Sequence, residues 1–332
     1  MSTYILLPLH FLAPVHFGDA SGGGGLDAVQ PIGRADTFFS ALCCEAIRQG
    51  ASALERIVRK TEIGDITFSD LLPWYQRDGE YEWYVPKPVL SMPAQPAKDE
   101  SLQEAKTNSS FRKQEKKRAF LRASELSLYI DDLRYGESSL TEEPTFSTAV
   151  SQVHFNGRTR SPYSAGGHFF APHAGLYSLI RLEKTEDTDW LITLVRLTGL
   201  SGIGGRKSSG MGRYDIQEVV TLSPEDENED TAALYDLLED KTAEEQMSLS
   251  SVLPKEEEIS LAARARGLWI RRSGLSWSQG MDVPVKMHPL YMLASGSCFD
   301  SCLTGRIADV STPAVGHPVY RYGKGLYVGV PK

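Results

Sequence analysis

One glycine-rich stretch, from residue 199 to residue 213, constrains this chain more than any other segment. Its fifteen residues, GLSGIGGRKSSGMGR, include six glycines, three serines, two arginines and one lysine. Glycine adopts positive φ angles without steric cost and lets the backbone approach a bound group closely. Successive backbone N–H groups can then form a concave surface that binds anions, and Arg206 and Lys207 add positive charge to it. The composition therefore predicts a loop that binds a phosphate backbone.

The stretch matches neither of the two common nucleotide-binding loops. A P-loop requires a glycine directly before its lysine, whereas Arg206 precedes Lys207 here. A Rossmann fingerprint follows a strand, whereas residues 190–197 have the pattern of a helix, and this context argues against a nucleotide-binding enzyme. A flexible linker is the simplest alternative for such a composition. It is disfavoured because residues 213–220, on the other side, alternate like a strand.

Composition limits the protein class and the compartment. With 43 acidic and 35 basic residues the net charge is −8 and the pI is about 5.5, unlike a free-standing nucleic-acid binder, although local basic loops remain compatible with it. No apolar run is long enough for a transmembrane helix, and the first residues lack the features of a signal peptide. The cysteine pairs 43/44 and 298/302 fit neither a zinc site nor a disulfide framework, so we expect free thiols and a cytoplasmic location.

The periodicity of the chain predicts alternating strands and helices in its first half. We expect a first strand over 4–11, with Pro8 marking an edge or a bend, and a helix that has Asp36 as its N-cap and ends before Gly50. Further strands are expected over 81–90, 148–155 and 168–182, with a hairpin tip at Asn156-Gly157. Residues 94–118 are polar and basic and are interpreted as an inserted, partly disordered segment.

The second half is predicted to be rich in strands, and an acidic run separates it from the first half. The run 226–230 is interpreted as a solvated linker at a domain boundary. Strands are expected over 247–253, 265–272, 283–293 and 320–330. In the first half the order strand, helix, strand, strand, helix, strand is that of a ferredoxin-like split βαβ domain, and the fold class is α+β.

A ferredoxin-like domain with the sequence Gly-x-Gly-Gly-Arg-Lys-Ser-Ser-Gly-x-Gly before its last strand resembles the RAMP superfamily of CRISPR systems. Other segments narrow the resemblance to the type III-A Csm complex subunit that caps the crRNA 5′ end. They are PVHFG at 14–18, ADTFFSAL at 35–42, VPKP at 85–88, GSCF at 296–299 and HPVYRYG at 317–323. The resemblance covers nearly the whole chain, whereas the insertion at 94–118 matches no motif.

The resemblance implies two RRM-like domains, at 1–222 and at 223–332, the first with an insertion at about 91–165 and a thumb hairpin that wedges into the crRNA–target duplex. It implies that the chain binds the crRNA 5′ handle and docks the large polymerase-like subunit and the first backbone RAMP subunit. Target RNA would be reached through the complex. No cofactor, metal site or membrane contact is expected.

The residues that the resemblance assigns to RNA binding come from four segments. They are His16 and Gly18 after the first strand, Asp36 and Ser40 on the first helix, Arg158 and Arg160 near the thumb, and Gly202, Gly204, Gly205, Arg206, Lys207, Ser208, Ser209, Gly210, Gly212 and Arg213 in the loop.

A second function, a crRNA-processing endoribonuclease of the same superfamily, stays open at this point. His16 is the candidate general acid or base, but such chemistry needs a second group within hydrogen-bond reach, and the sequence indicates none. Asp36 could be catalytic, although aspartate is common at helix N-caps. Trp269 and Trp277 could stack on bases, or they could pack in the core or against a partner. We therefore expect a scaffold subunit without catalytic residues.

Overall fold

The computed structural model describes residues 2–18, 25–90, 117–135, 139–155, 159–276 and 281–331. The predicted insertion at 94–118 therefore lies outside the described residues except for its last two. The predicted hairpin tip at Asn156-Gly157, with Arg158, and Trp277 also lie outside them.

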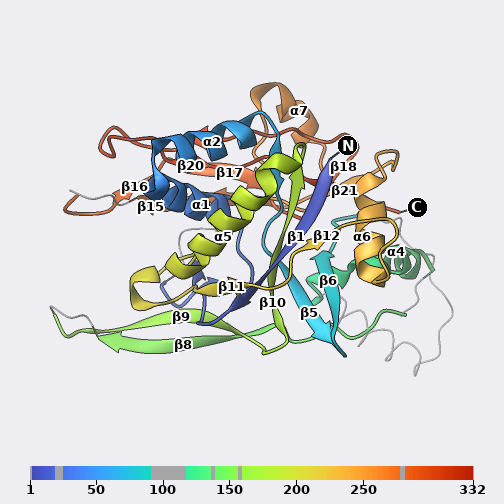
Figure 1. Ribbon diagram of the computed structural model, residues 1–332, viewed down its shortest axis with the longest axis horizontal. Helices are drawn as coiled ribbons and strands as arrows, with labels where there is room; N and C mark the ends of the chain where they lie inside the picture. Colours follow the sequence, from blue (N-terminus) through green and yellow to red (C-terminus); the bar gives the residue numbers. More distant parts are fainter. Residues whose placement is uncertain are drawn as a thin grey trace.

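An antiparallel sheet forms the centre of the molecule, and β1 (Thr3–Phe11) is one of its internal strands (Figure 1). Six of the seven central side chains of β1 are buried, as expected for an apolar strand covered on both faces. The strand order is β11–β1–β10–β5–β6–β7, with β12 also beside β1 and β4 also beside β10. Their bounds are β4 (Ile66–Phe68), β5 (Leu72–Arg77), β6 (Glu80–Pro86), β7 (Phe120–Arg122), β10 (Ala174–Leu182), β11 (Tyr214–Ile216) and β12 (Val220–Thr221).

The interpretation of Pro8 as an edge position is wrong, because β1 has a partner on each side. Leu9 to Phe11 pair with β11, and Ile5 and Leu6 pair with β12. Pro8 lies between these two pairings, where it accepts a hydrogen bond from the backbone N–H of Gln217 but has no N–H of its own to donate. The single strand expected over 213–220 is therefore interrupted where Pro8 faces it.

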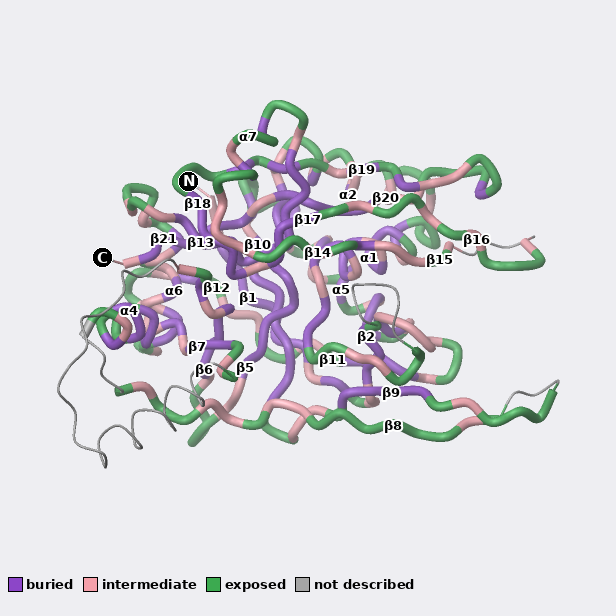
Figure 2. Tube along the Cα trace, turned by 180° about the vertical axis from the view of Figure 1, so that it is seen from behind, coloured by how far each residue is buried: buried purple, intermediate pink, exposed green. Residues whose placement is uncertain are grey.

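A long two-stranded hairpin extends from the body of the protein (Figures 1 and 2). Its strands β8 (Ser147–Phe155) and β9 (Pro162–Phe170) pair over their full length, as the hairpin signal predicted. The strand expected over 168–182 is in fact two strands, β9 and β10. A turn separates them, closed by a hydrogen bond of 3.0 Å from the N–H of Ala174 to the carbonyl of Ala171.

The helices α1 (Ala35–Gln49), α2 (Ala51–Glu62) and α5 (Thr188–Ser201) lie together over the sheet (Figure 1). Helix α1 begins after Arg34, so the expectation that Asp36 is its N-cap is wrong: Asp36 lies in the first turn. The helix buries Phe38, Phe39 and Leu42 and ends at Gly50, whose φ of 131° other residues disfavour. Shorter helices are α4 (Leu126–Tyr135), α6 (Glu229–Glu239) and α7 (Ile259–Ala262), with 3₁₀ turns η1 (Ala123–Glu125), η2 (Thr185–Asp187), η3 (Lys207–Ser209) and η4 (Glu256–Glu258).

The acidic run at 226–230 is not a solvated linker throughout. Asn228 caps α6, because its side chain accepts a hydrogen bond from the backbone N–H of Thr231. Asp230 is buried and binds the guanidinium of Arg122 at 3.0 Å and the hydroxyl of Ser124 at 2.6 Å. The charge of Asp230 therefore links α6 to the segment that follows β7.

The second half contains strands that are shorter than the sequence predicted. β13 (Gln246–Ser248) lies between β18 (Cys298–Phe299) and β21 (Tyr327–Gly329). Four antiparallel pairs complete the set of strands: β14 (Trp269–Arg272) with β17 (Leu290–Leu293), β15 (Leu275–Ser276) with β16 (Val285–Lys286), β19 (Ala308–Asp309) with β20 (Tyr320–Arg321), and β2 (Phe17–Gly18) with β3 (Val29–Gln30).

The two halves of the chain share one hydrophobic core. Tyr322 packs against Phe39 and Phe68 with ring centroids 5.6 and 5.8 Å apart. Its hydroxyl donates to the carbonyl of Phe68 at 3.0 Å and accepts from the N–H of Phe68 at 2.8 Å. The mixed helix and antiparallel-sheet architecture confirms the α+β class, whereas the boundary at 222/223 stays a prediction. Within the described ranges, no helix is long and apolar enough to cross a membrane.

Candidate nucleic-acid interface

The glycine-rich loop is a defined structure that connects α5 to β11. Its glycines with φ between 74° and 83° are Gly202, Gly204, Gly210 and Gly212, and Arg206 also has a left-handed conformation, with φ 59°. Ile203, inside the loop, is fully buried in the main core. A flexible linker has neither a fixed set of backbone angles nor a buried side chain, so the linker alternative is wrong.

Backbone hydrogen bonds attach the loop to the segment after β1. The N–H of Gly205 donates to the carbonyl of His16 at 2.8 Å, and the N–H of Gly212 donates to the carbonyl of Pro14 at 2.9 Å. A Cβ atom on Gly204 would lie 2.6 Å from the carbonyl oxygen of His16, so the close approach of the two segments requires glycine there. His16 and the loop, which the sequence placed in one site, are therefore neighbours.

Three successive backbone N–H groups of the loop remain available. In the part of the chain that the structure describes, the N–H groups of Arg206, Lys207 and Ser208 donate to no protein acceptor. The next two, of Ser209 and Gly210, close the turn η3 onto the carbonyls of Arg206 and Lys207, at 2.9 Å each. Adjacent unpaired N–H groups in such a turn can bind an anion.

Arg206 joins the loop to the long hairpin. Its Nη2 donates to the hydroxyl of Tyr163 at 3.0 Å, and its guanidinium lies 5.2 Å from the centre of the Tyr163 ring. That ring in turn stacks on His154 of β8, with centroids 5.6 Å apart. The Nε of Arg206 is buried and has no hydrogen-bond partner among the described residues. A cavity beside these groups, with a volume of about 460 Å³, is lined by Leu26, Phe155, Thr159, Ser161, Pro162, Tyr163 and Arg206.

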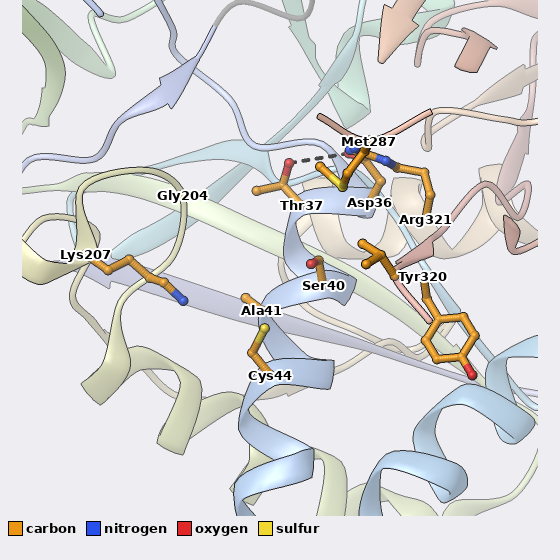
Figure 3. A pocket seen from close by; sticks show the side chains of 11 residues that line it. Asp36, Thr37, Ser40, Ala41, Cys44, Gly204, Lys207, Met287, Tyr320 and Arg321 are labelled. Carbon is orange, nitrogen blue, oxygen red and sulfur yellow. Dashed lines mark hydrogen bonds and ion pairs between the residues drawn. The ribbon is translucent and has the colours of Figure 1, made fainter. Parts of the chain in front are cut away.

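A second hollow, with a volume of about 170 Å³, separates the loop from α1 (Figure 3). Lys207 and Gly204 line it from the loop, and the side chain of Lys207 extends toward Ala41 of α1. The remaining lining residues come from α1 and from the second half: Asp36, Thr37, Ser40, Ala41, Cys44, Met287, Val319, Tyr320 and Arg321. The predicted residues Ser40 and Lys207 therefore face one hollow, which three distant parts of the chain build.

Asp36 is the one carboxylate among the residues that line this hollow, and its charge is already balanced. Its oxygens accept from Nε and Nη2 of Arg272, at 2.9 and 2.8 Å, and from Nη1 of Arg321 at 2.5 Å. Burial opposes the charge, but the guanidinium groups of Arg272 and Arg321 outweigh it and hold the pKa of Asp36 below its usual range. Asp36 is fully buried, so it holds the side of the hollow in place from inside the core.

The geometry around His16 gives little support to RNA cleavage by this chain. His16 is buried, and its Nδ1 lies 2.8 Å from the carbonyl oxygen of Gly166 in β9. Among the described residues, no carboxylate or second histidine contacts its ring. The same residues hold no cluster of histidine, cysteine and acidic side chains that suits a metal ion. A general acid–base pair therefore has no visible second member.

The other predicted residues fall into two groups. Gly18, Arg160, Ser208, Ser209 and Arg213 are exposed, with Gly18 next to the His16 ring and Arg160 at the described end of the hairpin. Gly202 and Gly212 are buried and set the backbone path of the loop. Arg158 lies outside the described residues.

Sequence reasoning missed the side chains from β9 and the second half that complete the site. Tyr163 lies between the hairpin tip and the next expected strand, and nothing in the sequence distinguishes it until Arg206 is seen to bind it. Arg272 is adjacent to Arg271 in the sequence, but only the strand pairing of β14 shows that Arg272 is buried whereas Arg271 is exposed. Arg321 lies in the HPVYRYG segment, which supported the family resemblance but for which the sequence predicted no contact with this site.

Comparison with known proteins supplies the family. The chain is 31% identical to the Csm4 protein of the CRISPR system of Mycobacterium tuberculosis, over 96% of this chain and 95% of that protein. The chain belongs to the Csm4 family. The Csm4 protein of Streptococcus thermophilus is 28% identical over 92% of this chain and 93% of that protein. A family model described as the CRISPR Csm4 C-terminal domain matches residues 241–330.

Two solved structures of Csm complexes share this fold. A chain of a Csm3–Csm4 subcomplex in the type III-A CRISPR-Cas interference complex matches with a TM-score of 0.62 and 15% identity, over 99% of this chain and 100% of that chain. A chain of a Csm1–Csm4 cassette in complex with cA4 matches with a TM-score of 0.60 and 19% identity, over 99% and 98%. At these identities the likeness concerns the fold of this Csm4-family chain.

Proposed function

We propose that this chain is the non-catalytic subunit of a type III-A Csm interference complex that binds the crRNA 5′ handle. Membership of the Csm4 family supports the assignment to the complex. Binding of the handle is supported by the interface between the glycine-rich loop, α1 and the long hairpin. The proposal includes a cytosolic location, to which the four free thiols are suited.

The observation that carries the proposal is a set of cationic and N–H groups in the glycine-rich loop that lack acidic partners, with Lys207 lining the hollow beside α1 and Arg206 lining the cavity beside Tyr163. Neither Arg206 nor Lys207 lies within 4 Å of a carboxylate in the described chain, and the N–H groups of Arg206, Lys207 and Ser208 are unpaired. The nearby carboxylate of Asp36 is neutralised by two arginines. A phosphodiester backbone offers the charge and the acceptors that such a surface lacks, and backbone contacts position an RNA without cutting it.

The long hairpin supports the expected thumb. Val153 and Phe155, at its outer end, are 65% and 70% exposed, which is unusual for apolar side chains on a strand that meets only water. Side chains of this kind can be inserted between bases at the end of a duplex. In the proposed complex the hairpin would separate a crRNA–target base pair while Arg206, which contacts Tyr163 near its outer end, binds the handle.

A further surface is suited to a protein partner. Trp269 and Tyr291 lie on the outer face of the β14–β17 pair, 51% and 61% exposed, whereas Arg272 and Met292 are buried. Exposed aromatic side chains of this size are enriched at protein interfaces. We propose that this face contacts one of the two neighbouring subunits, the large polymerase-like subunit or the first backbone subunit.

The finer domain assignment also belongs to the proposal. The order β11–β1–β10–β5, together with α1 after β1 and α5 after β10, is the arrangement of a ferredoxin-like split βαβ unit. We infer one such RRM-like domain within residues 1–222. A second RRM-like domain at 223–332 is proposed on the family resemblance, and it shares the core described above.

The test of the proposed function is the salt dependence of handle binding. Arg206→Ala combined with Lys207→Ala removes two phosphate contacts, so the magnitude of the negative slope of log affinity against log salt should decrease by roughly 1.4 for single-stranded RNA. Arg271→Ala combined with Lys286→Ala, which removes two exposed cations from the second half, is the matched control and should leave the slope unchanged. Equal slopes for both double variants and the unmodified chain would refute the proposed site.

The scaffold proposal and the endoribonuclease alternative differ in what they predict for repeat RNA. If the chain is a scaffold, incubation of the purified chain with repeat RNA in the absence of metal should leave the RNA intact. Cleavage that His16→Ala abolishes would replace the scaffold proposal by the enzymatic one.

A further inference from the structure

A third cavity lies at the other end of β1 from the glycine-rich loop. β1 ends at Phe11, which pairs with Tyr214 beside the loop, whereas its start, at Thr3, pairs with Leu182. The cavity is next to this start and has a volume of about 490 Å³. Its walls come from both halves of the chain and include Tyr4, Arg181, Lys241, Cys302, Lys324 and Tyr327.

The carboxylates that line this cavity already have cationic partners. Asp65 lies 3.5 Å from Nζ of Lys60 and 3.5 Å from Nζ of Lys184. Glu183 lies 3.3 Å from Nε of Arg181. The negative charges of Asp65 and Glu183 are therefore balanced by these cationic groups, and the two carboxylates have little attraction left for a further cation.

Two lysines of the same cavity have only neutral partners. Nζ of Lys324, whose residue is 7% exposed, donates to the backbone carbonyl of Glu62 at 3.1 Å. Nζ of Lys241 donates to the carbonyl of Leu238 and lies 3.5 Å from the hydroxyl of Tyr4. Among the described residues, neither ammonium group lies within 4 Å of a carboxylate. Half-buried and buried ammonium groups without an acidic partner are uncommon in a folded protein.

The electrostatics of the cavity are consistent with a missing anion. Burial lowers the pKa of Lys241, and the positive charge of Arg181 adds to this, whereas the negative charge of Glu239 opposes it. Burial also lowers the pKa of Lys324, and the charges of Lys255 and Arg181 add to this, whereas those of Glu258 and Glu62 oppose it. An anion between these groups would stabilise their charged forms and remove the repulsion.

We propose that this cavity is a binding site for a small phosphorylated molecule, with Lys241 and Lys324 as the groups that bind its phosphate. Two unpaired ammonium groups match the double charge of a phosphate monoester better than the single charge of a carboxylate. The volume exceeds that of phosphate alone and leaves room for an organic group beside Leu303, Leu326 and the two tyrosines. The site is separate from the proposed handle interface, and the proposal does not depend on handle binding.

The first test measures binding to the full chain by calorimetry, with inorganic phosphate, adenosine monophosphate and adenosine as probes. The two phosphate-bearing probes should bind, adenosine should not, and Lys241→Met or Lys324→Met should weaken binding by about tenfold or more, as expected for a lost charge-assisted contact. Lys286→Met, which alters an exposed lysine of another region, is the control. Affinity of either phosphate probe that is equal in all variants, or no binding at all, would overturn the proposal.

A second test uses the unmodified chain and so does not depend on the folding of a variant. Cys302 lines the cavity, whereas Cys44, which is also exposed, lines the hollow beside the glycine-rich loop. Alkylation of Cys302 should slow when adenosine monophosphate or phosphate is present, and alkylation of Cys44 should not change. Unprotected Cys302 at saturating probe, or equal protection of both thiols, would contradict a ligand in this cavity. Handle binding measured in parallel should stay the same, which separates this result from the proposed function.

Discussion

At the scale of single residues, two glycines of the loop have the same backbone angle but different surroundings. Gly204 and Gly210 have φ of 81° and 83°, yet a Cβ would lie 2.6 Å from the carbonyl oxygen of His16 at Gly204 and would meet no atom within 4 Å at Gly210. Substitution at Gly210 therefore adds only the cost of a left-handed angle, whereas substitution at Gly204 also separates the loop from the segment after β1.

We expect Gly204→Val to reduce both handle binding and thermal stability, and Gly210→Ala to change each much less. The loop is attached to the core, because buried Ile203 follows Gly202 and the loop is hydrogen-bonded to residues 14–16. Binding and melting temperature are measured on the same preparations. Identical behaviour of the two variants would show that the contact with His16 does not matter.

Asp36 gives a second prediction at this scale, about stability and pH. Asp36→Asn leaves Arg272 and Arg321 without their anion inside the protein, and loss of one member of a buried ion pair costs about 3–5 kcal/mol of unfolding free energy. Because the folded-state pKa of Asp36 is depressed, its contribution is present above the unfolded pKa, about 4, and is lost as pH falls through the lower folded value.

Urea unfolding of the unmodified chain and of Asp36→Asn, measured between pH 7 and pH 3, tests this prediction. The difference in unfolding free energy should be largest near neutrality and should shrink toward pH 3. A difference that is independent of pH would mean that the carboxylate charge is not what stabilises the contact.

At the scale of elements, the outer part of the long hairpin is predicted to act without contributing to the stability of the body. Val153 is 65% exposed and does not line the cavity beside Arg206, so changing it to serine removes no buried contact. We expect the melting temperature and handle affinity to stay the same while the accessibility of the crRNA–target duplex to a chemical probe changes near the hairpin. Loss of handle affinity in this variant would indicate that the hairpin binds the handle itself.

The elements also show what the sequence can and cannot reveal. The strand over 4–11, the helix that ends before Gly50 and the β8–β9 pairing follow from local patterns, and the structure has all three. The break between β11 and β12 could not be found locally, because it depends on Pro8, which lies more than 200 positions away in the sequence. Likewise, Lys207 and the glycines carry a local signal, whereas Tyr163, Arg272 and Arg321 reach the site only through tertiary contacts.

At the scale of the whole molecule, the two halves are joined by polar contacts as well as by the shared core. Asp70 accepts from the N–H of Ala35 at 2.8 Å, from the hydroxyl of Ser251 at 3.0 Å and from the guanidinium of Arg34 at 3.0 Å. The indole of Trp83 donates to the hydroxyl of Thr231 at 2.9 Å. If the two halves separated, Asp70 would lose its hydrogen bond from Ser251 and the indole of Trp83 would lose its acceptor on Thr231.

We therefore expect a chain cleaved between residues 222 and 229 to stay associated and to unfold in a single transition. The separate fragments, 1–222 and 223–332, should not fold alone, but they should form a soluble complex when produced together. Size-exclusion chromatography and calorimetry of the cleaved protein provide the measurement. Two independent unfolding transitions would show that the halves are autonomous domains.

The most direct measurement of the central claim is the mapping of contacts between the handle and the chain in the assembled complex. Handle RNA with photoreactive uridines is cross-linked, and the attached peptides are identified by mass spectrometry. We expect cross-links in residues 202–213, with further ones on α1 near Ser40 and on the β8–β9 hairpin near Tyr163. Handle cross-links confined to other surfaces of the chain, with none in the glycine-rich loop, would contradict it.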